Sequence, residues 1–129
     1  MTTFLEAVGT ATAAVLRRYP TNAVPPTPVY PYLVYSVAGD RAEGYTLDSR
    51  HGFRFYRIIL QSFDKPSLAS ALDIDDKAVA GLLDKRLAVT GYDCGPCRLE
   101  VASAVVRDPD TTGVVSVTTT LTFTATKES

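Results

Sequence analysis

The 129-residue sequence has no tryptophan, one histidine and two cysteines. Two cysteines fall short of the four ligands of a structural zinc site. The net charge is −1, so the chain lacks the excess of positive charge that attracts nucleic acid or an anionic membrane surface. It also lacks an apolar run of the roughly 18 residues that a membrane span needs. Its first twenty residues have neither the basic start nor the apolar core of a signal peptide. We therefore expect one globular domain over residues 1–129, folded in the cytoplasm, with reduced cysteines and no membrane contact.

Two segments have the spacing of helices. Residues 3–19 carry apolar side chains three and four positions apart, Thr3 and Glu6 have capping-box spacing, and Pro20 should end the helix. The second helix is expected over Pro66–Leu87 in two pieces. The carboxylates of its second piece should cap that piece, and they are Asp73, Asp75 and Asp76.

Between and after these helices the sequence indicates strands. A stiff, proline-rich connector, residues 20–31, leads into them, and Gly39–Gly44 and Gly91–Pro96 are expected to be turns or loops. The expected strands are Tyr32–Val37, a short one at Tyr45–Asp48, Phe53–Phe63, Arg98–Val106 and Gly113–Thr126. Phe53–Phe63 is apolar on both faces, which is typical of a central strand. This order predicts an α+β fold, a single-domain sandwich in which two helices pack on an antiparallel sheet.

The last strand has the clearest pattern in the chain. From Val115 to Ala125, apolar residues and Thr119 alternate with serines and threonines, so one face is apolar and the other carries hydroxyl groups. A strand of this length exceeds the usual range. We therefore expect it to lie at an edge of the sheet or to extend past it.

Cys94-Gly95-Pro96-Cys97 matches the redox motif of thioredoxins. In that family the first cysteine lies at a helix N-terminus, which lowers its pKa. Here Arg98 and the residues after it have a strand pattern, and no tryptophan precedes the motif. We expect a tight turn whose cysteines are dispensable, such that a double Cys→Ser variant folds and assembles normally. A small thiol-disulfide oxidoreductase that uses Cys94 and Cys97 is the alternative from another functional class.

No other residues form a recognisable catalytic, metal or cofactor site. His51 lies in a predicted turn without a suitably placed nucleophile and acid. The carboxylates lack the glycine and distal glutamate of a calcium loop, and the chain has no phosphate-binding glycine loop. Tyrosines and arginines concentrate between Tyr30 and Arg57. The acidic residues among them favour a protein–protein interface over single-stranded nucleic acid. We expect a protein that is not an enzyme and has no cofactor.

The order of segments resembles the tail terminator (tail completion) proteins of long-tailed phages. The resemblance begins with the N-terminal helix and the proline-rich connector into Val29–Tyr35, and continues through Phe53–Phe63 and the helix after it. It is closest at Val105–Asp110, where a turn with Gly113 leads into an alternating C-terminal strand. Residues 64–74 and the Cys94–Cys97 loop depart from the family pattern.

The resemblance implies a role in the virion, at the junction of tail and neck, after assembly in the host cytoplasm. Its partners would be further copies of itself in a ring, expected to be a hexamer, together with the tail tube protein and a head-side connector or stopper protein. The ring would end tube polymerisation, and DNA would pass through its lumen without specific binding. Another neck or head–tail joining ring protein is the alternative within the structural class.

Two segments are candidates for contacts between copies. The predicted loop Gly39–Gly52 carries mixed charges that suit a pairwise contact, namely Arg41, Glu43, Asp48 and Arg50. The C-terminal strand, if it is an edge, offers free backbone groups next to Thr118, Thr120 and Thr122.

Overall fold

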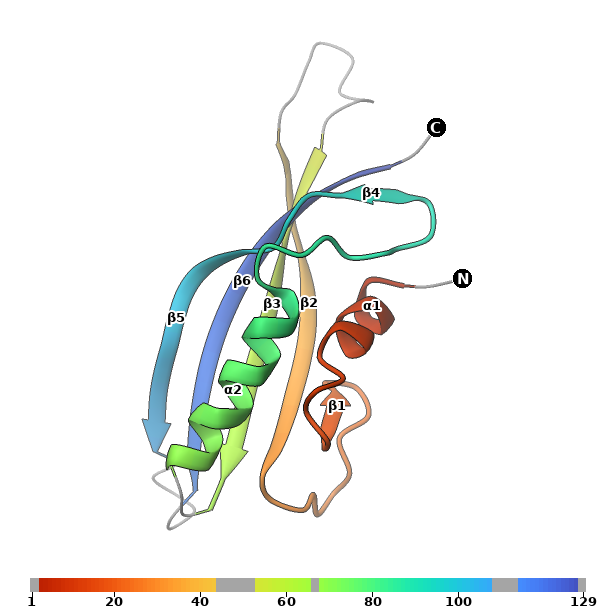
Figure 1. The fold of residues 1–129 in the computed structure, drawn as a ribbon. Coiled ribbons are helices and arrows are strands. Elements are labelled where there is room, and N and C mark those ends of the chain that lie inside the picture. The colour runs from red at the N-terminus through yellow and green to blue at the C-terminus, as the bar shows by residue number, and fades with distance from the viewer. Residues whose placement is uncertain (1–2, 44–52, 66–67, 108–113, 128–129) are drawn as a thin grey trace.

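The computed structural model describes residues 3–43, 53–65, 68–107 and 114–127 (Figure 1). The elements follow in the order α1 (Phe4–Ala11), β1 (Arg18–Pro20), β2 (Tyr32–Glu43), β3 (Phe53–Asp64), α2 (Leu68–Leu82), β4 (Tyr92–Cys94), β5 (Arg98–Arg107) and β6 (Val115–Lys127). The predicted α+β class is therefore confirmed. No helix in these ranges is long and apolar enough to cross a membrane.

The strands form one sheet of six in the order β1-β2-β3-β6, with β5 and β4 both paired to the far side of β6. β3 lies between β2 and β6, as the apolar pattern on both its faces predicts. All pairs are antiparallel except β1–β2, so the sheet is mixed rather than purely antiparallel. The parallel pair involves β1, which was not predicted, because its residues have the apolar spacing of the first helix.

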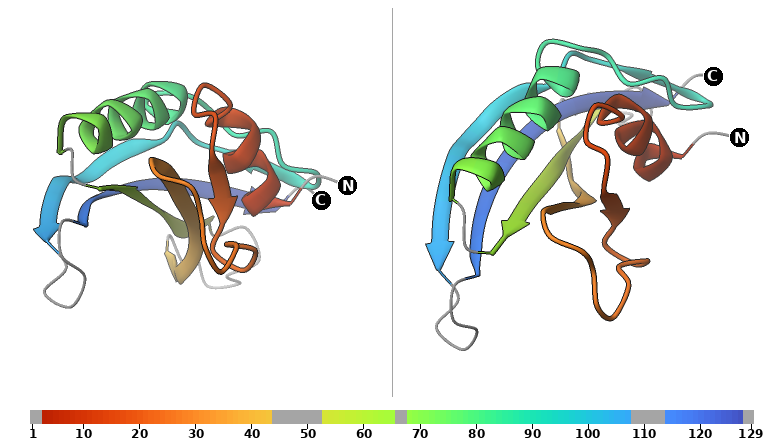
Figure 2. Two further views of the ribbon diagram at one scale, coloured as in Figure 1. Left: turned by 90° about the horizontal axis from the view of Figure 1, so that it is seen from below. Right: turned by 60° about the horizontal axis from the view of Figure 1, so that its bottom comes forward.

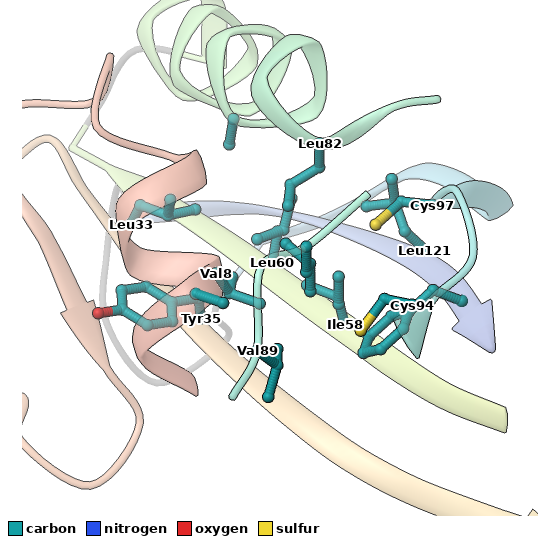
Figure 3. Packing of buried hydrophobic residues seen from close by; sticks show 14 of the residues in the cluster. Val8, Leu33, Tyr35, Ile58, Leu60, Leu82, Val89, Cys94, Cys97 and Leu121 are labelled. Atoms are coloured by element: carbon teal, nitrogen blue, oxygen red, sulfur yellow. The ribbon is translucent and has the colours of Figure 1, made fainter. Parts of the chain in front are cut away.

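Both helices lie on the same face of the sheet (Figure 2). α2 packs over β3 and β6, and α1 packs over β2. Between the layers lies the core, where Val8 of α1 and Leu82 of α2 meet Leu33, Leu60 and Leu121 of the sheet (Figure 3). All of these side chains are fully buried. The opposite face of the sheet carries no helix among the described residues.

Helix α1 is half the predicted length, because the chain turns at Thr12. The Val8 carbonyl accepts from the Thr12 hydroxyl at 2.9 Å and from the Thr12 N–H at 3.0 Å. After Thr12 the helical pattern gives way to turn bonds, from the Ala13 N–H to Thr10 and from the Val15 N–H to Thr12. The predicted cap is present, since the Glu6 N–H donates to Thr3 Oγ1 at 3.2 Å. Beyond the helix, Arg18 Nε donates to the Gly9 carbonyl at 2.8 Å. Arg18 thus stabilises the helix end as a cation should, although it lies in a strand.

Helix α2 is continuous through Asp73, Asp75 and Asp76, so the prediction that these carboxylates cap a second piece is wrong. Asp73 instead pairs with Lys77, one turn later, at 3.2 Å. Asp75 is buried on the inner face of the helix.

Strand β2 continues to Glu43, where a polar turn was expected, and a register shift between Gly39 and Ala42 places Asp40 and Arg41 opposite one residue of β3. The predicted loop before Pro96 contains the short strand β4. The predicted strand Tyr45–Asp48 lies outside the described residues.

The C-terminal strand β6 is alternating as predicted, with Val115, Val117, Leu121 and Phe123 buried on the core face. The expectation that it lies at an edge is wrong. β3 pairs with it from Val115 to Ala125. On the other side, β5 pairs with Val115–Thr122 and β4 with Ala125–Lys127. Its length reflects two shorter partners placed end to end.

Candidate interaction surfaces

The charged residues expected at an interface fall at the far end of β2. Arg41 lies within the register shift and Glu43 pairs with Phe53, at the last rung of the β2–β3 ladder. Asp48 and Arg50 lie outside the described residues. Arg41 and Glu43 therefore belong to a strand, where we expected a loop.

The three threonines expected at an interface lie on the helix-free face of β6. Thr118, Thr120 and Thr122 are half-buried and pair with Gln61, Ile59 and Arg57 of β3. Their backbone groups are engaged by β3 on one side and β5 on the other. The threonines therefore offer hydroxyl groups on a face, but not the free strand edge that was predicted.

The helix-free face is rich in hydroxyl groups and close to neutral among its described side chains. One ion pair crosses it, from Arg57 of β3 to Glu100 of β5, with Nε and Oε1 3.1 Å apart. The two side chains are 43% and 36% exposed, so this pair contributes little to stability. It does tie β5 to the sheet across β6.

The structure does not bring the two predicted segments together. The sheet row that contains Thr122 and Arg57 reaches β2 at Ala38, and Arg41 lies further along that strand. Among the described residues, the free edges of the sheet are β5 and the distal half of β2, and the second of these contains Arg41 and Glu43 (Figure 1).

The β2 edge is half covered. The Leu33 N–H donates to the Arg17 carbonyl at 2.9 Å, and the Thr21 N–H donates to the Tyr35 carbonyl at 3.0 Å. Leu33 and Tyr35 thus direct their backbone groups outward, and by the period of two so does Val37. No strand within the described residues pairs with β2 on this side beyond Tyr35.

A pocket of about 330 Å³ lies beside this half-open edge. Its walls are Thr3, Phe4, Leu5, Thr21, Asn22, Val37 and Tyr56. The rings of Phe4 and Tyr56 stack with centroids 4.5 Å apart, which makes an aromatic wall. The pocket therefore offers an apolar lining on the helix-covered face of the sheet.

Large apolar side chains are exposed at three described positions. Leu16 is 86%, Val29 59% and Leu99 47% exposed. Leu99 differs from the other two because it lies on a strand, at the free β5 edge. One leucine between Arg98 and Glu100 carries no periodic signal, so its exposure could not be predicted from the sequence.

The Cys94–Cys97 loop is built into the core. The Cys97 N–H donates to the Lys85 carbonyl, and the Asp84 N–H donates to the Cys97 carbonyl, both at 2.9 Å. Arg86 donates to the Cys94 carbonyl at 3.1 Å. β5 begins directly after Cys97, so no helix N-terminus faces either sulfur. Both side chains belong to the hydrophobic cluster (Figure 3).

This burial sets the chemistry of the two thiols. It raises the pKa of Cys97 to about 11, with a smaller contribution from Cys94. Burial also raises the pKa of Cys94, and Asp93 adds to the effect. Both are therefore protonated near neutral pH, whereas a redox nucleophile has to be a thiolate. Because both side chains are in the core, the expectation that serine replaces them without consequence does not fit their surroundings.

Among the described residues, no three histidine, cysteine, aspartate or glutamate side chains gather into a group able to hold a metal ion. What the described surface offers is two strand edges, one helix-free sheet face, an apolar pocket and three exposed apolar side chains. These are features of contacts between proteins.

The fold is a small α+β layer structure, with two helices on one face of a curled mixed sheet. No family model matches the sequence, and comparison with curated proteins finds no match. Among solved structures, the fold is similar to a chain of the "Virion of native gene transfer agent (GTA) particle". The TM-score is 0.75 at 12% sequence identity, over 96% of this chain and 95% of that chain. At this sequence identity, the structural similarity demonstrates a common fold alone.

Proposed function

We propose that this chain is a structural protein of a phage-like virion, and within the virion a tail terminator. The observation that carries the proposal is the fold shared, over nearly the full length of both chains, with a component of a gene transfer agent virion. The same class of particle is implied independently by the resemblance of the segment order to tail terminators.

In this role the protein forms a ring, expected to be a hexamer, on the last ring of the tail tube. A head-to-tail contact that closes by rotation gives a ring with two different faces. One face meets the tube protein and stops its polymerisation, and the other meets the head-side connector. The hydroxyl-rich face of the sheet suits the DNA passage, since few charges there would hold a sliding polyanion.

Two other functions make different predictions. Another ring of the head–tail junction could share this fold, but it would bind the connector and not the tube end. A thiol-disulfide oxidoreductase would reduce insulin, and the buried, protonated thiols of Cys94 and Cys97 argue against it.

Native mass spectrometry and negative-stain images of the protein, alone and mixed with its tail tube protein, test the proposal. We expect rings at tube ends, including the case in which the free protein is a monomer. Rings that bind the connector but do not bind the tube would favour the alternative, another ring protein of the head–tail junction. A protein that stays monomeric with both partners would contradict any ring.

A further inference from the structure

We propose that Leu99 on the free β5 edge of one copy enters the pocket beside the half-open β2 edge of the next copy. The sheet would then continue from copy to copy through antiparallel pairing of β5 with β2. This inference rests on the proposed ring, since it names the contact that closes the ring.

The first support is the position of the two features along the sheet. Leu99 pairs with Leu121, Leu121 with Ile58, and Ile58 with Val37. The four residues therefore form one row across the sheet, with Leu99 and Val37 at its two ends. Partners directly opposite one another share a face, so both ends of the row belong to the helix-covered face. Val37 is also a wall of the pocket.

The second support is the symmetry of a ring. A closed ring relates neighbouring copies by rotation without a rise. If the strands run along the ring axis, each residue keeps its height, and Leu99 of one copy meets the next copy at the level of Val37. The row within one copy thus becomes the contact between two.

The third support is strand direction. β2 is antiparallel to β3, β3 to β6, and β6 to β5, so β5 is antiparallel to β2. Rotation about an axis along the strands preserves this relation. The pairing between copies is then antiparallel, and the outward N–H and C=O groups of Val37 can join it.

The side chains agree with this contact. Leu99 is 47% exposed, although it is a leucine at the end of a core row. The pocket at the other end of the row has Phe4, Leu5 and Tyr56 in its walls. Register shifts after Leu99 in β5 and after Gly39 in β2 keep the regular stretch at this level short. A second copy of this chain therefore fits as the partner, joined by a short ladder and one apolar anchor.

A disulfide trap tests the register directly. Within one copy Leu99 and Val37 are three strand spacings apart, about 14 Å, which is too far for a disulfide. The variant Val37→Cys with Leu99→Cys should therefore cross-link only between copies. On tube ends, under oxidation, we expect covalent oligomers up to the full ring. The matched control, Val29→Cys with Leu99→Cys, should give at least tenfold less product.

A second variant tests the anchor. Leu99→Glu should fold like the wild type but reduce ring formation at tube ends at least tenfold, while Leu16→Glu, at another exposed leucine, should leave rings intact. Rings without the Val37–Leu99 cross-link, or rings that tolerate Leu99→Glu, would overturn this contact and leave the proposed function standing. If the wild type makes no rings on tubes at all, the proposed function fails first, and this contact fails with it.

Discussion

At the scale of single residues, Cys97 shows how burial converts a redox motif into core packing. Its side chain is fully buried, and its backbone makes two hydrogen bonds to the chain after α2, at Asp84 and Lys85. The glycine and the proline between the two cysteines therefore form a short connection from β4 to β5. The chemistry of the motif depends on a helix that this chain does not supply.

Burial of Cys97 also predicts a pH dependence of stability. The pKa of this thiol rises from 9.0 to about 11 on folding. Below pH 9 the Cys97 thiol is protonated in both the folded and the unfolded protein. Between pH 9 and about 11 the thiol loses its proton in the unfolded chain and keeps it in the folded one. The free energy of unfolding therefore falls as pH rises through this range, by up to about 1.4 kcal/mol per pH unit. Urea unfolding at several pH values should show a shallower fall for Cys97→Ala. Equal slopes for the two proteins would contradict the predicted shift.

Gly81 of α2 packs directly against the end of α1. A Cβ atom there would overlap the carbonyl oxygen of Ala11. Alanine at an open helix position stabilises by about 1 kcal/mol over glycine. Here we expect Gly81→Ala to destabilise, by about 1–3 kcal/mol, because the overlap is with backbone.

Denaturant unfolding of Gly81→Ala measures this effect, with Ala80→Gly as its control. Ala80 is the exposed neighbour, and that change should show the ordinary loss of helix propensity alone. A stabilised Gly81→Ala variant would mean that α1 and α2 are further apart than described.

At the scale of elements, β6 determines how the sheet is organised. It pairs with β3 along one side and with β5 and β4 along the other. A proline at Thr120 would remove a ladder donor in the middle of this strand, where sheets do not accommodate proline. We therefore expect Thr120→Pro to unfold the monomer, whereas Thr120→Val keeps the donor and the fold. Circular dichroism of both variants checks this. A folded proline variant would contradict the central position of β6.

The sequence predicted this molecule best where a pattern is local. The alternation of β6, the apolar faces of β3 and the cap at Thr3 are each set by neighbouring residues, and each is confirmed. Strand pairings were harder to predict, because β3, which pairs with β6 along one side, lies far from β6 in the sequence. A strand with one apolar face has the same alternating sequence pattern at an edge and in the middle of a sheet.

The predicted end of the first helix, at residue 19, was wrong for a related reason. α1 ends at Ala11, and residues after the turn at Thr12 form β1 by pairing with β2. This pairing is a tertiary contact, and such contacts can override helical spacing. The proposal of Thr118, Thr120 and Thr122 as interface residues was limited in the same way, because it assumed a free edge at β6.

At the scale of the whole molecule, the charged end of β2 remains a proposed contact between copies. Arg41 lies there, and Arg50 belongs to the same stretch of sequence. We expect Arg41→Glu or Arg50→Glu to weaken rings several-fold and to leave the monomer folded, since charges at an interface act mainly on association. Sedimentation of the variants with tail tubes checks this, and Arg41→Lys is the control. Full ring assembly by both reversals would place the contact elsewhere.

The central claim is that this protein ends the growth of a tail tube, and tube length measures that most directly. Purified tail tube protein is polymerised with increasing amounts of this chain, and the lengths are read from negative-stain images. We predict shorter tubes as the ratio rises, each with a ring at one end. Tubes whose length distribution is the same with and without the protein would contradict the account.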